Sequence, residues 1–366
     1  MKIGVPKEII SQEYRVGINP ITAQLLIENS HEVFVENNAG IHSGYSNSDY
    51  QQVGCTILDK AVDVFDAAEL IVKVKEPSLE EVELLKNKII FTYLHLSSSK
   101  ELTEKLLNCN TTSIAYETVN IDNELPMLKP MSEIAGRLAI LDCISLLKKN
   151  NQGKGKLISG TSLTDPANVI ILGAGIVGVN ALEMSLGLGA NTTILDINEE
   201  RLAAVKESYP KANIAISTSE TINKLLPNAD IVIGAVLTIG AKPPILITRE
   251  MLKLMQPKSI LSDVSIDQGG CFETSKATTH DNPTYEVDGI IHYCVKNIPS
   301  AVPLTATNAL NEATRPYILY LANNGLVGLK DNFELKMGLN TYKGHLLNKE
   351  VAEAHNLNYS NPNKIL

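Results

Sequence analysis

Residues 169–198, VIILGAGIVGVNALEMSLGLGANTTILDIN, carry the clearest structural signal in this chain. The apolar start predicts a strand, and the glycines Gly173, Gly175 and Gly178 follow it in the spacing G-x-G-x-x-G. A helix-compatible segment comes next, and a second predicted strand ends at Asp196. This order of strand, turn, helix and strand predicts a βαβ unit with a glycine-rich turn.

Each of these residues has a physical role in binding a dinucleotide. Gly173 permits the tight turn, Gly175 lets the backbone approach a pyrophosphate, and Gly178 lets the helix pack close to the strand. The N-terminus of the helix supplies N–H groups and a partial positive charge. Asp196 suits the ribose hydroxyls and would repel a 2′-phosphate, which favours NAD over NADP. The positive charge of Arg201, one turn later, acts against this preference. The alternative is a glycine-rich turn in an ordinary βαβ unit.

The composition limits the classes of partner. The chain has 366 residues, 44% of them hydrophobic and 20% charged, which is enough for two cores. The net charge is −9 and no block of Lys or Arg occurs, which argues against nucleic acid and anionic membranes as partners. The start MKIGVPKEII lacks a signal-peptide pattern, and no apolar run approaches the roughly 18 residues of a membrane span. The five cysteines form no C-x-x-C pair, so we expect a cytoplasmic protein without a zinc site.

Strand-like and helix-like segments alternate along the rest of the chain. Strands are predicted at 2–5, 69–77, 88–96, 228–237 and 259–267, and long helices at 127–149 and 305–325. Ser132 is predicted to cap the first of these helices. The alternation indicates an α/β fold with parallel sheets, which bind ligands at the ends of their strands.

Four polar side chains outside the glycine turn could carry chemistry. His95 ends an apolar strand and has the ordinary pKa that suits acid–base work near neutrality, or it is a structural histidine. The segment 69–77 carries Lys73 and Lys75, and Arg15 lies in a polar loop. Arg15 and Lys75 suit a small carboxylate, or they are solvated charges. Asp267 could exchange protons beside a nicotinamide, or it forms a turn. No metal-ligand spacing and no G-x-S-x-G motif is present.

Short segments spread over nearly the whole chain match the sequence pattern of a known protein family. They include GVPKE, YRVGINP, VKVKEP, YLHL, MSEIAGRLA, GAGIVGVNALEMSLGLGA, DVSIDQGGCFETS and GLNTYKGHL. Through these segments the sequence resembles the alanine dehydrogenases, which are related to the α subunit of nicotinamide nucleotide transhydrogenase.

The resemblance implies roles for individual residues. Arg15 and Lys75 would bind the carboxylate and carbonyl of the substrate, and His95 and Asp267 would form the acid–base pair. Besides the three glycines, the NAD site would include Ser132, Ile176, Val177, Asp196, Arg201, Thr218, Leu237, Val264, Ser265, Ile266, Asp267, Lys276, Val295, Lys296, Asn297 and Ile298. No metal is implied.

The sequence departs from the family pattern at a few positions. Lys276 stands where the family usually has Arg, and Thr218 and Ile298 stand where other members often have Ser and Met. The last two changes keep the hydroxyl and the apolar contact. The connector 151–168 lacks the Gly-Val-Pro-Gly run that usually precedes the glycine turn.

The resemblance implies two Rossmann-like, doubly wound α/β domains. The substrate domain would be discontinuous, over 1–132 and 305–366, and the NAD-binding domain would span 133–304. Helices near 133–149 and 305–322 would connect the domains, and the cleft between them would hold the site. The implied activity is the reversible, NAD-dependent oxidative deamination of L-alanine to pyruvate and ammonium, in a homohexamer.

Two other functions stay open at this point. One is a transhydrogenase α-like subunit, which passes hydride to a second nucleotide-bound subunit. The other is a non-catalytic NAD-binding module that serves regulation. The set Arg15, Lys75 and His95 argues against both, because only a small substrate needs it.

Overall fold

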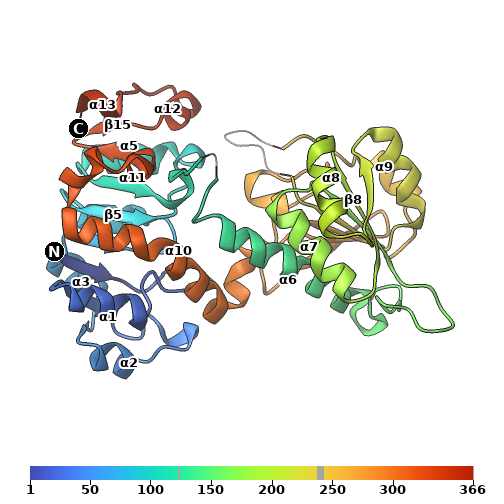
Figure 1. Ribbon diagram of the computed structural model, residues 1–366, viewed down its shortest axis with the longest axis horizontal. Coiled ribbons are helices and arrows are strands. Elements are labelled where there is room, and N and C mark those ends of the chain that lie inside the picture. The colour runs from blue at the N-terminus through green and yellow to red at the C-terminus, as the bar shows by residue number, and fades with distance from the viewer. Residues whose placement is uncertain (123, 237–242, 366) are drawn as a thin grey trace. The chain divides into compact units, whose positions relative to one another are not determined.

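The computed structural model describes residues 1–122, 124–236 and 243–365, and the chain forms two compact units. Unit 1 consists of Met1–Met131 with Ser300–Leu366, and unit 2 of Ser132–Pro299. Each unit has one mainly parallel sheet with helices around it (Figure 1). The predicted fold class, two Rossmann-like α/β domains, is confirmed.

The sheet of unit 1 has eight strands in the order β15-β14-β6-β5-β4-β1-β2-β3. Its strands are β1 (Lys2–Val5), β2 (Glu32–Glu36), β3 (Thr56–Leu58), β4 (Leu70–Val72), β5 (Ile89–Thr92), β6 (Thr112–Ala115), β14 (Leu339–Tyr342) and β15 (His345–Leu346). The first six are parallel, whereas β14 runs antiparallel to both β6 and β15. The chain winds outward from β1 in both directions, so a topological switch point lies between β1 and β4.

Short helices connect the strands of unit 1, and a long helix follows the return of the chain from unit 2. They are α1 (Pro20–Glu28), α2 (Asn47–Gln52), α3 (Ala61–Ala67), α4 (Leu79–Leu84), α5 (Lys100–Asn108), α10 (Pro303–Asn324), α11 (Phe333–Gly338), α12 (Lys349–His355) and α13 (Pro362–Ile365). A capping box starts α4: Ser78 accepts from the Glu81 N–H, and Glu81 accepts from the Ser78 N–H.

The sheet of unit 2 has seven strands in the order β12-β13-β11-β10-β7-β8-β9. They are β7 (Asn168–Leu172), β8 (Asn191–Asp196), β9 (Asn213–Ile216), β10 (Ile231–Gly234), β11 (Ile260–Asp263), β12 (Thr284–Val287) and β13 (Ile290–Tyr293). Among the described strands of this sheet, β12 alone is antiparallel to its neighbour. The helices are α6 (Lys129–Leu147), which begins in unit 1, then α7 (Ile176–Gly187), α8 (Glu199–Ser208) and α9 (Ser219–Leu225).

The central strand β7 is buried on both faces. Val169 and Ile171 belong to the core on one side of the sheet, and Ile170 and Leu172 to the core on the other. A strand covered on both sides is typical of doubly wound parallel sheets, and it explains the uninterrupted apolar run before the glycine turn.

The glycine turn has the predicted conformation. Gly173 has φ +105°, and a Cβ there would lie 2.5 Å from the Ala235 carbonyl oxygen at the end of β10. A Cβ on Gly178 would lie 1.8 Å from the Gly173 carbonyl oxygen, where α7 crosses its own strand. The turn therefore requires glycine at Gly173, and the close approach of helix and strand requires glycine at Gly178.

Several predicted elements end earlier than expected. The strands predicted at 69–77, 88–96 and 259–267 end at Val72, Thr92 and Asp263. Beyond these ends, the backbone N–H groups of Val74, Leu94 and Ser265 donate to the side chains of Glu8, Glu117 and Asp263 instead of continuing the strand. The strand predicted at 228–237 is β10, and residue 237 lies outside the described residues. Ser132 does not cap α6, because this helix begins at Lys129 and Ser132 lies inside its first turns.

Two glycines of the same helix give a matched test of this packing. Gly178→Ala should lower the free energy of unfolding by about 1–3 kcal/mol, because its methyl group overlaps backbone that cannot move freely. Gly187→Ala should raise it by about 0.5–1 kcal/mol, because nothing lies within 4 Å of its Cβ position and alanine favours the helix. Urea unfolding measures both, and equal effects of the two variants would contradict the packing argument.

Candidate active site

The candidate residues of unit 1 follow neighbouring parallel strands. Arg15 follows β1, Lys75 follows β4 and His95 follows β5, and these strands are adjacent in the order β5-β4-β1. Tyr93 links them: burial raises the pKa of its hydroxyl, the charge of Arg15 offsets part of this rise, and its ring stacks on His95 with centroids 6.0 Å apart. The three candidates therefore occupy one end of the sheet, at its switch point.

Arg15 is held by a buried carboxylate. Its Nε and NH2 groups donate to the two oxygens of Glu13 over 2.7 and 2.5 Å, and its NH1 group donates to the Met131 sulfur over 3.0 Å. Arg15 is only 2% exposed. Burial lowers the pKa of Arg15, but the charge and hydrogen bonds of Glu13, with smaller effects of Tyr93 and Glu8, together outweigh burial, so the net pKa is raised and the guanidinium stays cationic.

The structure separates the two lysines that follow β4. Lys73 is fully buried, with its Nζ 2.7 Å from Glu81 Oε1 and 3.5 Å from Glu8 Oε2. Lys75 is half-buried, and among the described residues its ammonium forms no hydrogen bond or ion pair. The backbone of Lys75 is fixed instead: its N–H donates to Glu8 over 3.3 Å, and the hydroxyl of Thr92 donates to its carbonyl over 2.9 Å.

His95 lies just beyond β5 in a left-handed backbone conformation, with φ +48°. Its N–H donates to Glu117 Oε1 over 2.7 Å, and its Nδ1 lies 3.2 Å from Glu76 Oε2. Burial lowers the pKa of His95, but the hydrogen bond with Glu76 and the charge of Glu117 outweigh this effect, so the net pKa is raised. The side chain keeps 44% exposure, which leaves it accessible for proton exchange.

The glycine turn of unit 2 forms an open cradle. Gly175 is the N-cap of α7, and nothing lies within 4 Å of its Cβ position. The first N–H groups of α7, from Ile176 to Gly178, point outward from the helix start and have no intrahelical carbonyl to bind. This cradle fits a pyrophosphate, because the backbone leaves room for the phosphate oxygens and the helix end attracts them.

Asp196 ends β8 beside this cradle. Its carboxylate accepts from the N–H groups of Ala174 and Asn198 over 2.7 and 2.9 Å, and Arg201 NH1 lies 3.2 Å away. Burial raises the pKa of Asp196, but these hydrogen bonds and the charge of Arg201 lower it more, so the net pKa is reduced. Arg201 therefore pairs with Asp196, and the carboxylate next to the glycine turn is ionised.

The segment after β11 turns around a buried carboxylate, Asp263. Its oxygens accept from the N–H groups of Ser265, Cys271 and Phe272, and from the hydroxyl of Ser275 over 2.5 Å. The 3₁₀ helix η7 (Val264–Gln268) forms here and places Asp267 on the surface. Asp267 therefore sits in a tight turn that other residues hold.

The remaining candidates of unit 2 also follow strand ends, with two exceptions. Thr218 caps α9 after β9, and the segment Val295 to Ile298 follows β13 with Val295 and Ile298 buried. Ser265 is 8% exposed and donates its hydroxyl to the Val236 carbonyl. The exceptions are Ser132 on α6 and exposed Lys276, whose N–H donates to Tyr285 Oη. Leu237 lies outside the described residues.

The carboxylates that hold these groups are not among the residues predicted from the sequence. Arg15 is held by Glu13, and His95 is held by Glu76 and Glu117. The turn that carries Asp267 is held by Asp263. A local signal exists for two of them, because Glu13 is two residues from Arg15 and Glu76 adjoins Lys75. Glu117 and Asp263 act across separate elements, so only the fold reveals them.

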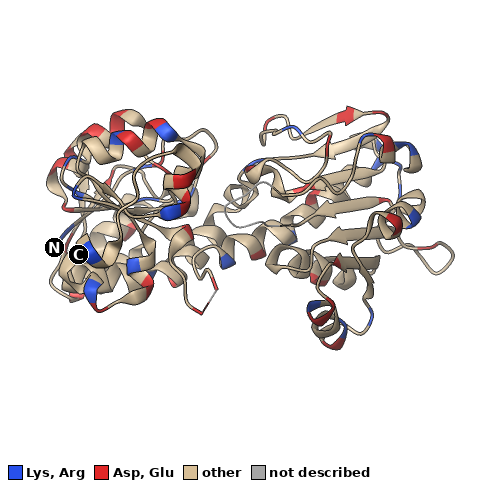
Figure 2. Cartoon of the chain, turned by 90° about the horizontal axis from the view of Figure 1, so that it is seen from above, with Lys and Arg blue, Asp and Glu red and all other residues tan. Residues whose placement is uncertain are grey.

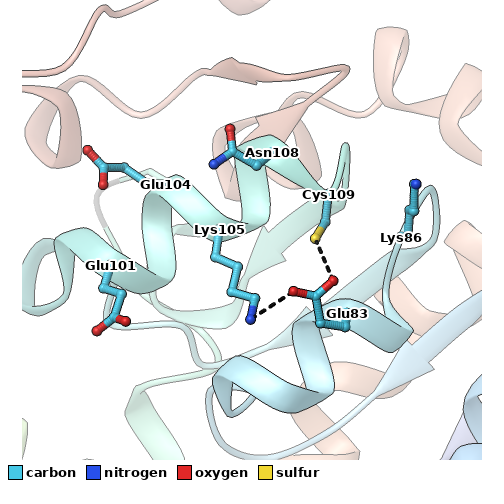
Figure 3. Close-up of a pocket in the computed structure, with 7 residues that line it drawn as sticks. All are labelled: Glu83, Lys86, Glu101, Glu104, Lys105, Asn108 and Cys109. Carbon is cyan, nitrogen blue, oxygen red and sulfur yellow. Dashed lines mark hydrogen bonds and ion pairs between the residues drawn. The ribbon is translucent and has the colours of Figure 1, made fainter.

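Unit 1 also contains a pocket of about 500 Å³ (Figure 3). It lies between α4 and α5 and is lined by Glu83, Lys86, Glu101, Glu104, Lys105, Asn108 and Cys109. Lys105 Nζ lies 2.9 Å from Glu83, so the charges partly pair with one another. None of the candidate residues lines this pocket.

The described ranges offer neither a metal site nor a membrane-spanning helix. No group of three or more His, Cys, Asp or Glu side chains there could hold a metal ion. Likewise, no described helix combines the length and apolar character that a membrane crossing needs. Figure 2 shows both acidic and basic residues on several of the helices.

Known proteins resemble this chain over its whole length. The family description "Alanine dehydrogenase/PNT, N-terminal domain" matches residues 4–135, and "Alanine dehydrogenase/PNT, C-terminal domain" matches residues 139–349. An alanine dehydrogenase of Methanococcus maripaludis is 47% identical over 100% of both chains. One of Staphylococcus haemolyticus and one of Halomonas elongata are each 46% identical over 98% of both chains.

Solved structures agree with this relationship. A structure of an L-alanine dehydrogenase matches with a TM-score of 0.94 and 44% identity, over 97% of this chain and 99% of that one. A transhydrogenase from Sinorhizobium meliloti shares the fold, with a TM-score of 0.80 and 22% identity over 95% of this chain and 99% of that one. Fold and relatives together define a dehydrogenase enzyme with a nucleotide-binding fold. More specifically, the chain belongs to the alanine dehydrogenase/PNT family.

The two lysines after β4 give a test of the buried charges. Lys73→Met should lower the free energy of unfolding by about 3–5 kcal/mol, because it leaves Glu8 and Glu81 without their buried cation. The loss should be larger at pH 8 than at pH 5. Burial already raises the pKa of Glu8, and removing Lys73 raises it further, so ionising Glu8 costs more folded-state stability as pH rises.

Lys75→Met is the matched control for this measurement. It should change the free energy of unfolding by less than about 1 kcal/mol, because Lys75 is half-buried and its ammonium has no partner among the described residues. Urea unfolding at the two pH values measures both variants. Equal destabilisation by both would show that Lys73 does not anchor the buried cluster.

Proposed function

We propose that this enzyme catalyses the reversible, NAD-dependent oxidative deamination of L-alanine to pyruvate and ammonium. One observation carries the proposal: a chain related to alanine dehydrogenases over its full length combines Arg15, Lys75 and His95 at one sheet end with a pyrophosphate cradle in unit 2. The first group suits a small carboxylate and a proton. The second suits a dinucleotide.

Arg15 and Lys75 would bind the substrate. Glu13 occupies one edge of the Arg15 guanidinium, and NH1 faces the sulfur of Met131, a weak acceptor that a carboxylate would displace. The low exposure of Arg15 limits this position to a small ligand. The Lys75 ammonium would then contact the carboxylate or the carbonyl oxygen of the oxo acid.

His95 and Asp267 would handle the protons. Bound NAD would supply the hydride acceptor, and alanine with a neutral amino group would lose the hydride from Cα and become an iminium. Water adds to this carbon, the π electrons pass to nitrogen, and His95 takes the proton from water. His95 then returns this proton to the nitrogen and takes the proton of the new hydroxyl group as ammonia leaves, so that the carbonyl of pyruvate forms. Asp267 would exchange protons beside the nicotinamide ring.

The cofactor would be held by residues of unit 2. The N–H groups from Ile176 to Gly178 would bind the pyrophosphate, and ionised Asp196 would accept from the ribose hydroxyls. A 2′-phosphate would meet the same negative charge, so NAD is preferred to NADP. The other NAD contacts implied by the family resemblance, such as Thr218, Ser265 and Lys276, form part of this proposal.

Two further properties belong to the same proposal. A cytoplasmic location is supported by the five cysteines, which are all free thiols and buried. A homohexamer is implied by the family resemblance, and light scattering on the purified protein would measure it.

A screen of purified protein tests the function directly. We expect NADH absorbance to appear with L-alanine and NAD, and to disappear with pyruvate, ammonium and NADH. Serine, glycine and 2-aminobutyrate with NAD, and alanine with NADP, complete the comparison. No turnover with any amino acid, despite NAD binding, would instead indicate a non-catalytic module.

Variants of the two proton-handling residues test the assignment of roles. His95→Ala and Asp267→Ala should each lower kcat by about 10²–10⁴-fold, because they remove general acid–base groups, while NAD affinity stays nearly unchanged. Asp281→Ala removes another exposed carboxylate of unit 2 and should leave both quantities unchanged. Near-normal turnover of His95→Ala or of Asp267→Ala would contradict that residue's role.

A further inference from the structure

His95 uses its two ring nitrogens differently. Nδ1 lies 3.2 Å from Glu76 Oε2, within hydrogen-bonding distance. Nε2 forms no hydrogen bond with any of the described residues, and the side chain is 44% exposed. One nitrogen is therefore engaged by the protein, and the other is available to a ligand.

Glu76 is suited to accept a proton-bearing Nδ1. Burial raises the pKa of Glu76, but its hydrogen bond with His95 and the charge of that ring lower it more, so the carboxylate is ionised at neutral pH. An ionised carboxylate only accepts hydrogen bonds. It therefore selects the neutral tautomer of His95 that carries its proton on Nδ1 and has a lone pair on Nε2.

A second carboxylate fixes the backbone that carries this ring. Glu117, in the 3₁₀ helix η3 (Tyr116–Thr118) after β6, accepts from the N–H of Leu94 and from the N–H of His95 over 2.7 Å. His95 has a left-handed φ of +48°, which is uncommon for a residue with a side chain. The backbone and the ring of His95 are thus held by two different acids.

We propose that Glu76 is a positioning residue for the reaction: it holds the His95 ring with Nε2 toward the substrate and stabilises the imidazolium that forms when Nε2 takes a proton. This inference rests on the proposed role of His95. In that step the proton that leaves water is carried on Nε2 and is later returned to the leaving nitrogen, while Glu76 stays ionised.

Other charged and titratable groups surround the ring and bear on its pH dependence. The charge of Glu117 raises the pKa of His95, and the charge of Lys75 lowers it. Tyr93 stacks on the ring and keeps its proton, because burial raises the pKa of its hydroxyl. From α12, His355 Nε2 contacts the Leu96 carbonyl rather than the His95 ring. Glu76 is the group that hydrogen-bonds to the ring itself, so it is the one to vary.

Glu76→Gln tests the proposal, because glutamine keeps the size and an acceptor oxygen but removes the charge. We expect kcat for alanine oxidation to fall about tenfold, less than for loss of the general base itself, with KM for alanine within about twofold. The acidic limb of the pH profile for oxidation should move to lower pH, and so should the alkaline limb for pyruvate amination. Both shifts follow because losing the Glu76 charge lowers the pKa of His95.

Three comparisons separate this role from a structural one. Glu76→Asp keeps the charge and should keep the pH limbs near their wild-type positions. Glu80→Gln removes an exposed charge on α4 and should change neither kcat nor the limbs. NMR titration of the His95 ring, which needs no turnover, should show the same downward shift of the pKa in Glu76→Gln. The Nδ1-protonated tautomer should be less strongly preferred, because glutamine can donate as well as accept a hydrogen bond.

The outcomes distinguish this inference from the proposed function. If His95→Ala is inactive and Glu76→Gln leaves the pH limbs and the ring titration unchanged, the positioning role is wrong and the function stands. If His95→Ala retains turnover, the proposed function of His95 fails, and the role of Glu76 fails with it. In the His95→Ala background, Glu76→Gln should have no further effect on kcat, and an additive loss would also overturn the inference.

Discussion

Parallel pairing of buried strands is the constraint on which the rest of this structure depends. Because parallel strands all end at the same edge of a sheet, residues far apart in sequence gather there. In unit 1 this edge collects Arg15, Lys75 and His95, and in unit 2 it collects the glycine turn and Asp196. Central strands such as β7 are covered on both faces and leave little room for polar side chains.

Carboxylates that are largely buried turn these strand ends into rigid sites. Glu13 fixes the plane of the Arg15 guanidinium, and Glu8 fixes the backbone of Lys75 while it also faces Lys73. In unit 2, Asp263 accepts several N–H groups and so shapes the turn before Asp267. Each acid replaces the water that a loop would otherwise bind, which keeps the groups oriented before a ligand arrives.

Much of unit 2 could be predicted because its signal is local. The apolar run of β7, the spacing of Gly173 and Gly178, and the acid at the end of β8 are close in sequence and depend on short-range geometry. The ends of elements were less predictable. The strand expected to reach residue 267 stops at Asp263, because its side chain draws the following N–H groups into a 3₁₀ turn.

Residue types and their spacing were sufficient to indicate two α/β domains, the dinucleotide turn and the polar groups that follow the strands. They could not tell that Lys73 is buried between Glu8 and Glu81 while Lys75 has no such partner, since both lie in one short segment. Nor could they pair His95 with Glu76 and Glu117. Those pairings join the ends of three different strands, and a distance between strand ends exists only once the sheet has assembled.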